Sequence, residues 1–219
     1  MVVSLTKQQA VYQRLKTLII EGKLKPGERL IIDDLAREFG LSIIPVREAL
    51  QLLQSDRLVE IRPHAGATVS PITVEHLDEI FTILEGLEAV TVRRLAETQP
   101  AGVLGKLEKI VAQLERATER ADIEHWSALN MEFHSQMSAA TNMPWLHEIT
   151  TRALRDWDRV RRYFFNRQTA HRFAEAQREH QNILAALREG DAARAEQIIR
   201  QHNQNALRHY RAGLEAAPT

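Results

Sequence analysis

Apolar residues recur every three or four positions along most of this chain, which is the period of an α-helix packed on one side. The first such stretch follows Thr6 and stops at Gly22, so it predicts a helix over about 5–21. A second, shorter stretch begins near Asp33 and stops at Gly40. Glycine often closes a helix because it adopts a positive φ without strain, so a short second helix is expected here.

A third helix and a pair of strands are expected after a short turn. Ser42 stands where an N-cap belongs and Pro45 falls in the first turn, so this helix is expected to run to about Ser55. The segments 58–61 and 67–70 are short and rich in strand-forming residues, and the residues between them supply a turn. The order helix, turn, helix, hairpin is typical of a module that places one helix in the major groove of DNA.

Beyond residues 71–73 the pattern changes to long helical periods with almost no strand signal. The breaks between these periods predict six helices, at about 74–98, 101–119, 122–141, 145–165, 168–189 and 191–211. We therefore expect a mainly α protein with two domains, a winged helix-turn-helix over 1–72 and an all-α helical bundle over 73–219.

The composition narrows the class of protein. With 44% apolar residues in 219, the chain can bury a proper core, and without cysteine it can form neither a disulfide nor a thiolate metal site. The N-terminus has no basic flank before an apolar core, and no run approaches the roughly 18 apolar residues of a membrane span. We therefore expect a cytoplasmic protein without membrane contact. The formal net charge is zero, which does not exclude DNA, because affinity depends on the phosphates met locally.

Two phrases in the N-terminal domain are specific. They read Pro-Gly-Glu-Arg-Leu at 26–30 and Pro-Val-Arg-Glu-Ala-Leu at 45–50, and with them this domain resembles the winged helix-turn-helix domain of the GntR family of bacterial transcription regulators. The resemblance implies that the start of the third helix and the tip of the wing contact bases of a double-stranded DNA operator. The residues at those positions are Ser42, Ile43, Ile44, Arg47, His64 and Gly66.

Arg47 has the clearest chemistry of this set, because a guanidinium can bond O6 and N7 of one guanine together. By the resemblance, many members have arginine and threonine where this chain has Ile43 and Ile44, and some have an arginine in place of Asp33. Isoleucine can touch a thymine methyl but cannot read guanine, so we expect an unusual operator. The alternative is that Arg47 only pairs with a neighbouring acid on the protein surface.

Three histidines in the C-terminal domain fall on apolar helix faces. His134 shares its stripe with Trp126 and Phe133, and His180 and His202 lie among aliphatic residues at the same spacing. Such rings can converge inside a bundle, where imidazole nitrogens bind Zn, Ni or a similar divalent ion. The alternative is three core histidines that bond to the backbone or to each other.

The C-terminal domain resembles the ligand-binding FCD domain of the FadR-type subfamily over nearly all of its length. That resemblance implies a metal site built from an Asp or Asn four residues before a histidine, together with two later histidines. The matching positions are Asn130, His134, His180 and His202. An amide oxygen at position 130 leaves the site more positive than an aspartate would, which favours an anionic ligand.

Arginines crowd one helix of this domain, and we expect some of them to turn inward as a clamp for a small carboxylate effector. The candidates are Arg152, Arg155 and Arg159. The arginine often found before the Glu-x-Leu-Glu segment of the FCD domain is replaced here by Leu84, so the geometry of acid binding is expected to differ.

These features favour a homodimeric transcription repressor, in which a small acid shifts the dimer between spacings that fit or miss the half-sites of a near-palindromic operator. The first alternative is a metal-dependent hydrolase fused to a DNA-binding module. We expect no enzyme, because Glu132, the carboxylate nearest in sequence, projects from a different helix face than His134. The second alternative is a constitutive dimeric DNA-binding protein without an effector.

Overall fold

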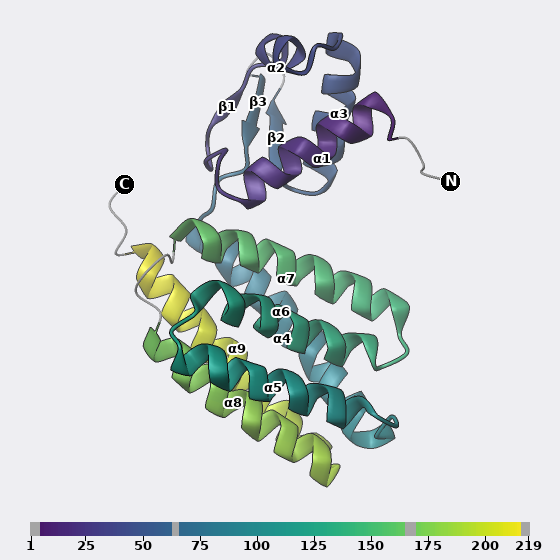
Figure 1. Cartoon of the computed structure of the whole chain (residues 1–219), viewed down its shortest axis with the longest axis vertical. Helices are drawn as coiled ribbons and strands as arrows, with labels where there is room; N and C mark the ends of the chain where they lie inside the picture. Colours follow the sequence, from purple (N-terminus) through teal and green to yellow (C-terminus); the bar gives the residue numbers. More distant parts are fainter. Residues whose placement is uncertain (1–4, 63–65, 165–169, 216–219) are drawn as a thin grey trace. The chain divides into compact units, whose positions relative to one another are not determined.

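The computed structural model describes residues 5–62, 66–164 and 170–215. The chain forms two compact units that divide between Ile72 and Thr73, each with its own apolar core (Figure 1). In the described residues the first unit combines helices with a small sheet, and the second contains helices alone. The predicted fold class, a winged helix-turn-helix followed by an all-α bundle, is confirmed.

The elements of the first unit are α1 (Lys7–Ile20), β1 (Arg29–Leu30), α2 (Ile32–Phe39), α3 (Ile43–Ser55), β2 (Val59–Arg62) and β3 (Gly66–Val69). α1 begins at a capping box, in which the side chains of Thr6 and Gln9 each accept a hydrogen bond from the other residue's backbone N–H. α2 ends at Gly40, whose φ of +63° is the left-handed conformation that glycine adopts without strain. The start of α1 and the end of α2 therefore lie close to the positions that the sequence pattern predicts.

The core of the first unit fixes the orientation of α3. Val46, Ala49, Leu50 and Leu53 are buried, as their helical spacing predicts, and α3 packs against α1 and α2 through this face. Ser42 precedes α3 with extended backbone, but its side chain makes no capping hydrogen bond. The outer face of α3 and the hydroxyl of Ser42 are thus left to solvent.

The three strands form an antiparallel sheet in the order β1–β3–β2. β2 and β3 make the predicted hairpin, with Val59 opposite Val69. The sequence pattern does not predict β1, because its two residues, Arg29 and Leu30, are too few to show alternation. β1 pairs with β3 and so ties the Pro-Gly-Glu-Arg-Leu segment to the wing.

The second unit contains α4 (Val74–Thr98), α5 (Val103–Glu119), α6 (Ile123–Ala139), α7 (Pro144–Phe164), α8 (Ala170–Glu189) and α9 (Ala192–Glu215). All six helices that the sequence predicts for this unit are present, with ends close to those expected. α4 packs along α9, and α5 packs against both α6 and α8 (Figure 1). One apolar core joins α4, α5, α6, α8 and α9, and it brings the inner faces of α6, α8 and α9 together.

Two of the three tryptophans help to build this unit. Trp126 stacks on Phe173 with ring centroids 4.3 Å apart, and Trp157 packs edge-on against Tyr210. Trp145 differs from them, because 76% of its surface is exposed near the start of α7.

Candidate metal centre and nucleic-acid interface

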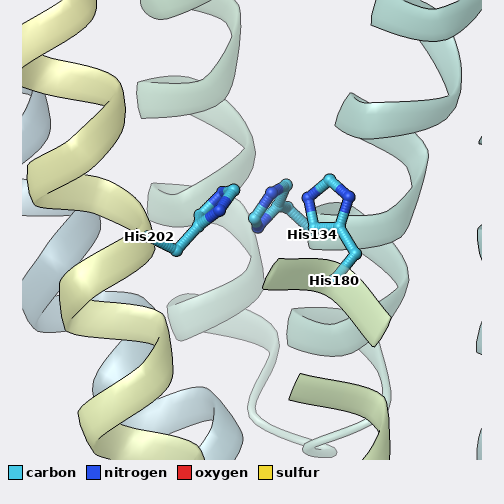
Figure 2. A group of neighbouring side chains, drawn as sticks. All are labelled: His134, His180 and His202. Carbon is cyan, nitrogen blue, oxygen red and sulfur yellow. The ribbon is translucent and has the colours of Figure 1, made fainter. Parts of the chain in front are cut away.

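Three histidine rings meet in the interior of the second unit, as the three apolar stripes predict. His134 comes from α6, His180 from α8 and His202 from α9, and all three side chains are buried (Figure 2). One ring nitrogen from each histidine lies within 4.8 Å of the others. The helices therefore place three potential nitrogen donors at one point.

The carboxylate of Glu179 contacts the ring of His202. Its Nδ1 lies 2.7 Å from Oε2 of Glu179, and Nη2 of Arg172 lies 2.7 Å from the same oxygen. Asn205 donates a hydrogen bond to the other oxygen of Glu179 at 2.6 Å. Burial raises the pKa of Glu179, but His202 and Arg172 outweigh it and bring the pKa to about 2. Glu179 is therefore ionised at neutral pH and orients the ring of His202.

A second carboxylate stands beside His134. Nδ1 of His134 lies 2.7 Å from Oε1 of Glu88, although the approach is bent, so neither atom has a well-aligned hydrogen bond. The other oxygen of Glu88 accepts a hydrogen bond from Nδ2 of Asn203 at 2.7 Å. Burial raises the pKa of Glu88, but His134, Asn203 and His202 outweigh it and hold the pKa below its usual range.

Sequence reasoning missed Glu88, although the sequence contains a signal for it. The inner stripe of α4 runs through Phe81, Leu84 and Leu95, and Glu88 falls on the same stripe. A charged residue on an apolar stripe needs a polar partner in the core. Only the packing of α4 on α6 and α9 shows that the partners are His134 and Asn203.

His180 has no polar support of this kind. It is fully buried, and neither of its ring nitrogens has a hydrogen-bond partner within the described residues. Burial holds its pKa well below 6.5, and the neighbouring His202, His134 and Arg172 add to the effect. A buried polar atom without a partner costs about 1–3 kcal/mol, so a neutral imidazole left in this state is unfavourable. Hydrogen bonding within a core does not account for this residue.

The unsatisfied atoms fit a divalent metal ion. Oδ1 of Asn130, one helical turn before His134, is also buried without a hydrogen-bond partner among the described residues. Three imidazole nitrogens and one amide oxygen form a donor set suited to zinc or nickel. Burial also lowers the pKa of His202, with Glu179 opposing the shift in part, so His180 and His202 are both favoured in the neutral form that binds metals.

The arginines expected to clamp an effector do not form one cluster. Arg152 and Arg155 are exposed, which does not support their predicted contact with a ligand inside the bundle. Arg159 is buried, and burial lowers its pKa although Asp156 opposes the shift. Sequence reasoning missed Arg172, a buried guanidinium that reaches the histidines through Glu179 and through the backbone oxygen of His202.

In the first unit, the residues predicted to contact bases lie at the start of α3. Ser42, Ile43, Ile44 and Arg47 are all exposed, and Ile44 has 65% of its surface in solvent. Arg47 takes part in none of the ion pairs or hydrogen bonds among the described residues, so the predicted alternative of a pairing acid finds no support.

The wing contributes one described residue of the predicted set. Gly66 is exposed and has a φ of +91°. Residues with a Cβ adopt this conformation only with strain. His64 lies outside the described residues. A Cβ at position 66 would lie 3.8 Å from the guanidinium of Arg29. Sequence reasoning did not include Arg29 among the candidate DNA-binding residues. The guanidinium of Arg29 thus lies beside Gly66, near the end of the β2–β3 hairpin.

Comparisons with known proteins agree with this architecture. Residues 7–69 match the gntR family of bacterial regulatory proteins, and residues 79–205 match the FCD domain. The chain belongs to the gntR family. As a family member it is a DNA-binding transcription regulator and not an enzyme. Glu132, the base considered for a hydrolase, is exposed. Among the described residues, no helix combines the length and apolar content that crossing a membrane requires.

Several relatives of this GntR protein cover it well. The transcriptional regulator McbR of Escherichia coli (strain K12) is 37% identical over 147 residues, which are 67% of this chain and 66% of that protein. The transcriptional repressor GlaR of the same organism is 30% identical over 200 residues, or 87% of this chain and 90% of GlaR. The solved structure of E. coli McbR/YncC is 28% identical with a TM-score of 0.74, covering 94% of this chain and 98% of that one.

Chelator-treated protein is expected to lose stability as the pH falls from about 7.5 to about 5.5. The pKa values of His180 and His202 are lowered below 6.5, so the unfolded chain takes up protons that the folded chain does not. Each such proton lowers the free energy of unfolding by about 1.4 kcal/mol per pH unit. Glu179 does not contribute in this range, because its charge is lost only below the unfolded pKa of 4.5.

Urea unfolding at each pH measures this slope. His180→Gln should reduce the slope by about one proton, whereas the same change at the exposed His125 should leave the slope as in the wild type. A wild-type slope in His180→Gln would mean that this imidazole titrates normally in the folded protein.

Proposed function

We propose that this GntR regulator is a homodimeric repressor whose C-terminal unit holds a divalent ion, zinc or nickel, and senses a small carboxylate there. The observation that carries the proposal is His180, which is fully buried with both ring nitrogens unsatisfied within the described residues. The relative GlaR, named as a transcriptional repressor, supports the direction of regulation.

The residues that would hold the ion are His134, His180, His202 and Asn130. Nδ1 of His202 faces Glu179, and Nδ1 of His134 lies close to Glu88. Nε2 of both rings is therefore the atom left for a metal, since a histidine ligand commonly uses its other nitrogen to contact a carboxylate. A bound ion would supply positive charge and an open coordination position for an anionic oxygen.

The buried charges around the histidines favour a small anion as the effector. Glu88 and Glu179 each contribute one negative charge, while Arg172 contributes one positive charge at 2.7 Å from Glu179. The imidazoles bind metal in their neutral form. A divalent ion would therefore leave one positive charge in excess, which a carboxylate would neutralise. Arg159 is the predicted clamp residue whose burial supports a role inside the bundle.

Metal-free wild-type protein should gain thermal stability when zinc or nickel is added. At an ion concentration of 100 times the Kd, mass action adds about 2.7 kcal/mol to the free energy of unfolding. His180→Gln keeps a polar side chain but removes a ligand, so it should lose most of this gain. His125→Gln, on the surface of α6, should behave as the wild type. Calorimetry with metal analysis makes the comparison, and equal metal content in His180→Gln would place the ion elsewhere.

Exposed apolar side chains on the second unit support a homodimer. Ile83 and Val90, seven residues apart on α4, share a helix face, and Trp145 and Ile149 share a face of the adjacent α7. Apolar patches of this kind mark protein contacts. A two-fold dimer would present two copies of α3 to the half-sites of a near-palindromic operator, and a bound effector would shift the dimer between spacings that fit or miss them.

Arg47→Ala should weaken binding to a duplex selected from a random pool by the wild-type protein. The lost contact with a guanine edge is worth about 1–3 kcal/mol, or roughly 5- to 150-fold in Kd. Arg116→Ala changes the net charge equally but lies on α5 of the other unit, so it should leave the Kd close to that of the wild type. Fluorescence anisotropy at one fixed salt concentration measures both variants. Equal losses would mean that Arg47 contributes only net charge.

The exposed Ile43 and Ile44 predict that thymine methyl groups contribute to operator affinity. Replacing thymine by deoxyuridine removes only that methyl, and one buried methyl-sized group is worth about 0.8 kcal/mol, or about fourfold in Kd. The wild type should therefore lose affinity at one or two positions of each half-site. Ile44→Ala should bind more weakly and no longer respond to deoxyuridine at the position it contacts. An unchanged response of Ile44→Ala at every position would exclude this contact.

A further inference from the structure

Glu88 is a buried charge that neither the DNA-binding surface nor the histidine donor set includes. Only 2% of its surface is exposed, and a buried carboxylate costs several kcal/mol unless it is paired. Its partners in the described residues are Nδ1 of His134 and the amide of Asn203, each 2.7 Å away. Histidine binds a metal ion as a neutral imidazole, so with an ion in place these two partners would offer hydrogen bonds but no full positive charge. The negative charge of Glu88 would then be left to offset the positive charge of the ion.

Glu179 shows what a completed pairing looks like in the same core. It lies against Nδ1 of His202 as Glu88 lies against Nδ1 of His134, but Arg172 stands 2.7 Å from it and balances its charge. The described ion pairs give Glu88 no such arginine or lysine. The charge of Glu88 is thus the one left to act on the histidine cluster.

Asn130 would not supply the negative charge that a divalent ion attracts. It lies one turn before His134 on α6 with its Oδ1 buried and unsatisfied among the described residues, and an amide brings no negative charge to a metal ion. The carboxylate nearest to His134 comes from α4 instead.

Building on the proposed metal site, we infer that Glu88 is the positioning residue that enables this cluster to hold a divalent ion. Glu88 keeps the proton of His134 on Nδ1, so that Nε2 is presented to the ion, and supplies the negative charge that Asn130 lacks.

A purely structural role for Glu88 predicts a different outcome. Glu88 also joins α4 to α9 through Asn203, so its loss would then lower the stability of the metal-free protein and leave metal affinity unchanged. Glu88→Gln separates the two roles, because glutamine retains an oxygen for the amide of Asn203 but carries no charge. Urea unfolding of the metal-free variants measures any effect on stability separately from metal affinity.

The test measures the Kd for zinc by competition with a chromophoric chelator, using the full-length protein. Glu88→Gln should bind zinc about 10- to 100-fold more weakly than the wild type, as expected when a carboxylate behind a histidine ligand is lost. Glu85→Gln is the matched control, because Glu85 lies one turn earlier on α4 and contacts Arg200 and Gln204 instead of the histidines. Zinc affinity in Glu88→Gln equal to that in Glu85→Gln would overturn the inference.

A second variant tests the charge directly. Asn130→Asp places a carboxylate on α6, one turn before His134, instead of on α4. It should restore much of the lost zinc affinity in the Glu88→Gln background and add less in the wild type. The reason is that either carboxylate alone would supply the negative charge that the ion requires. An equal gain in both backgrounds would show that they act independently and would exclude a shared role.

These outcomes separate the role of Glu88 from the existence of the site. If the wild type and Glu85→Gln bind no zinc, the proposed metal site is wrong and the role of Glu88 is lost with it. If both bind zinc and Glu88→Gln binds as tightly, the site stands and only the role of Glu88 is wrong.

Discussion

Burying an imidazole with no partner for either nitrogen costs about 1–3 kcal/mol per atom, and the second unit does this to His180 in the middle of its core. Around that ring the bundle gathers His134 and His202, with Glu88 and Glu179 behind them. These side chains come from α4, α6, α8 and α9, so the polar centre joins four of the helices that also share the apolar core. A cation bound by these atoms would stabilise the arrangement, and its binding and the folding of the unit would then be parts of one equilibrium.

The two units use burial in opposite ways. In the first unit the core is apolar, and the side chains with recognition chemistry, Arg47 and Ile44, are left in solvent on the outer face of α3. DNA presents its information on an exposed groove, and an exposed helix can read it. In the second unit the chemistry lies inside, where low dielectric strengthens the attraction between a small ion and its site. The exposed DNA-reading surface and the buried histidine cluster therefore lie in separate units, which divide after Ile72.

The local sequence pattern predicted most of this fold, because helix period, caps and turns depend on residues that are close together in the sequence. The inward face of α3 and the burial of His134, His180 and His202 follow from spacing, whereas their shared site was implied by the resemblance to the FCD domain. The features that the pattern missed depend on contacts between distant residues. Strand β1 exists because Arg29 and Leu30 pair with β3, and two residues show no period. Glu88 and Arg172 act across helices that only packing brings together, and the surface position of Arg152 and Arg155 depends on which face α7 buries.

One helix runs from the end of the first unit to the buried histidine cluster. α4 starts at Val74, two residues after the first unit ends, and Thr73 caps it by accepting a hydrogen bond from the backbone of His76. Glu88 lies fourteen residues along α4, which at the rise of an α-helix is a lever arm of about 21 Å. A tilt of about 5° at Glu88 would move the first turn of α4 by about 2 Å. The length of this helix would thus amplify a small change at Glu88 into a larger displacement at the N-terminal end of α4.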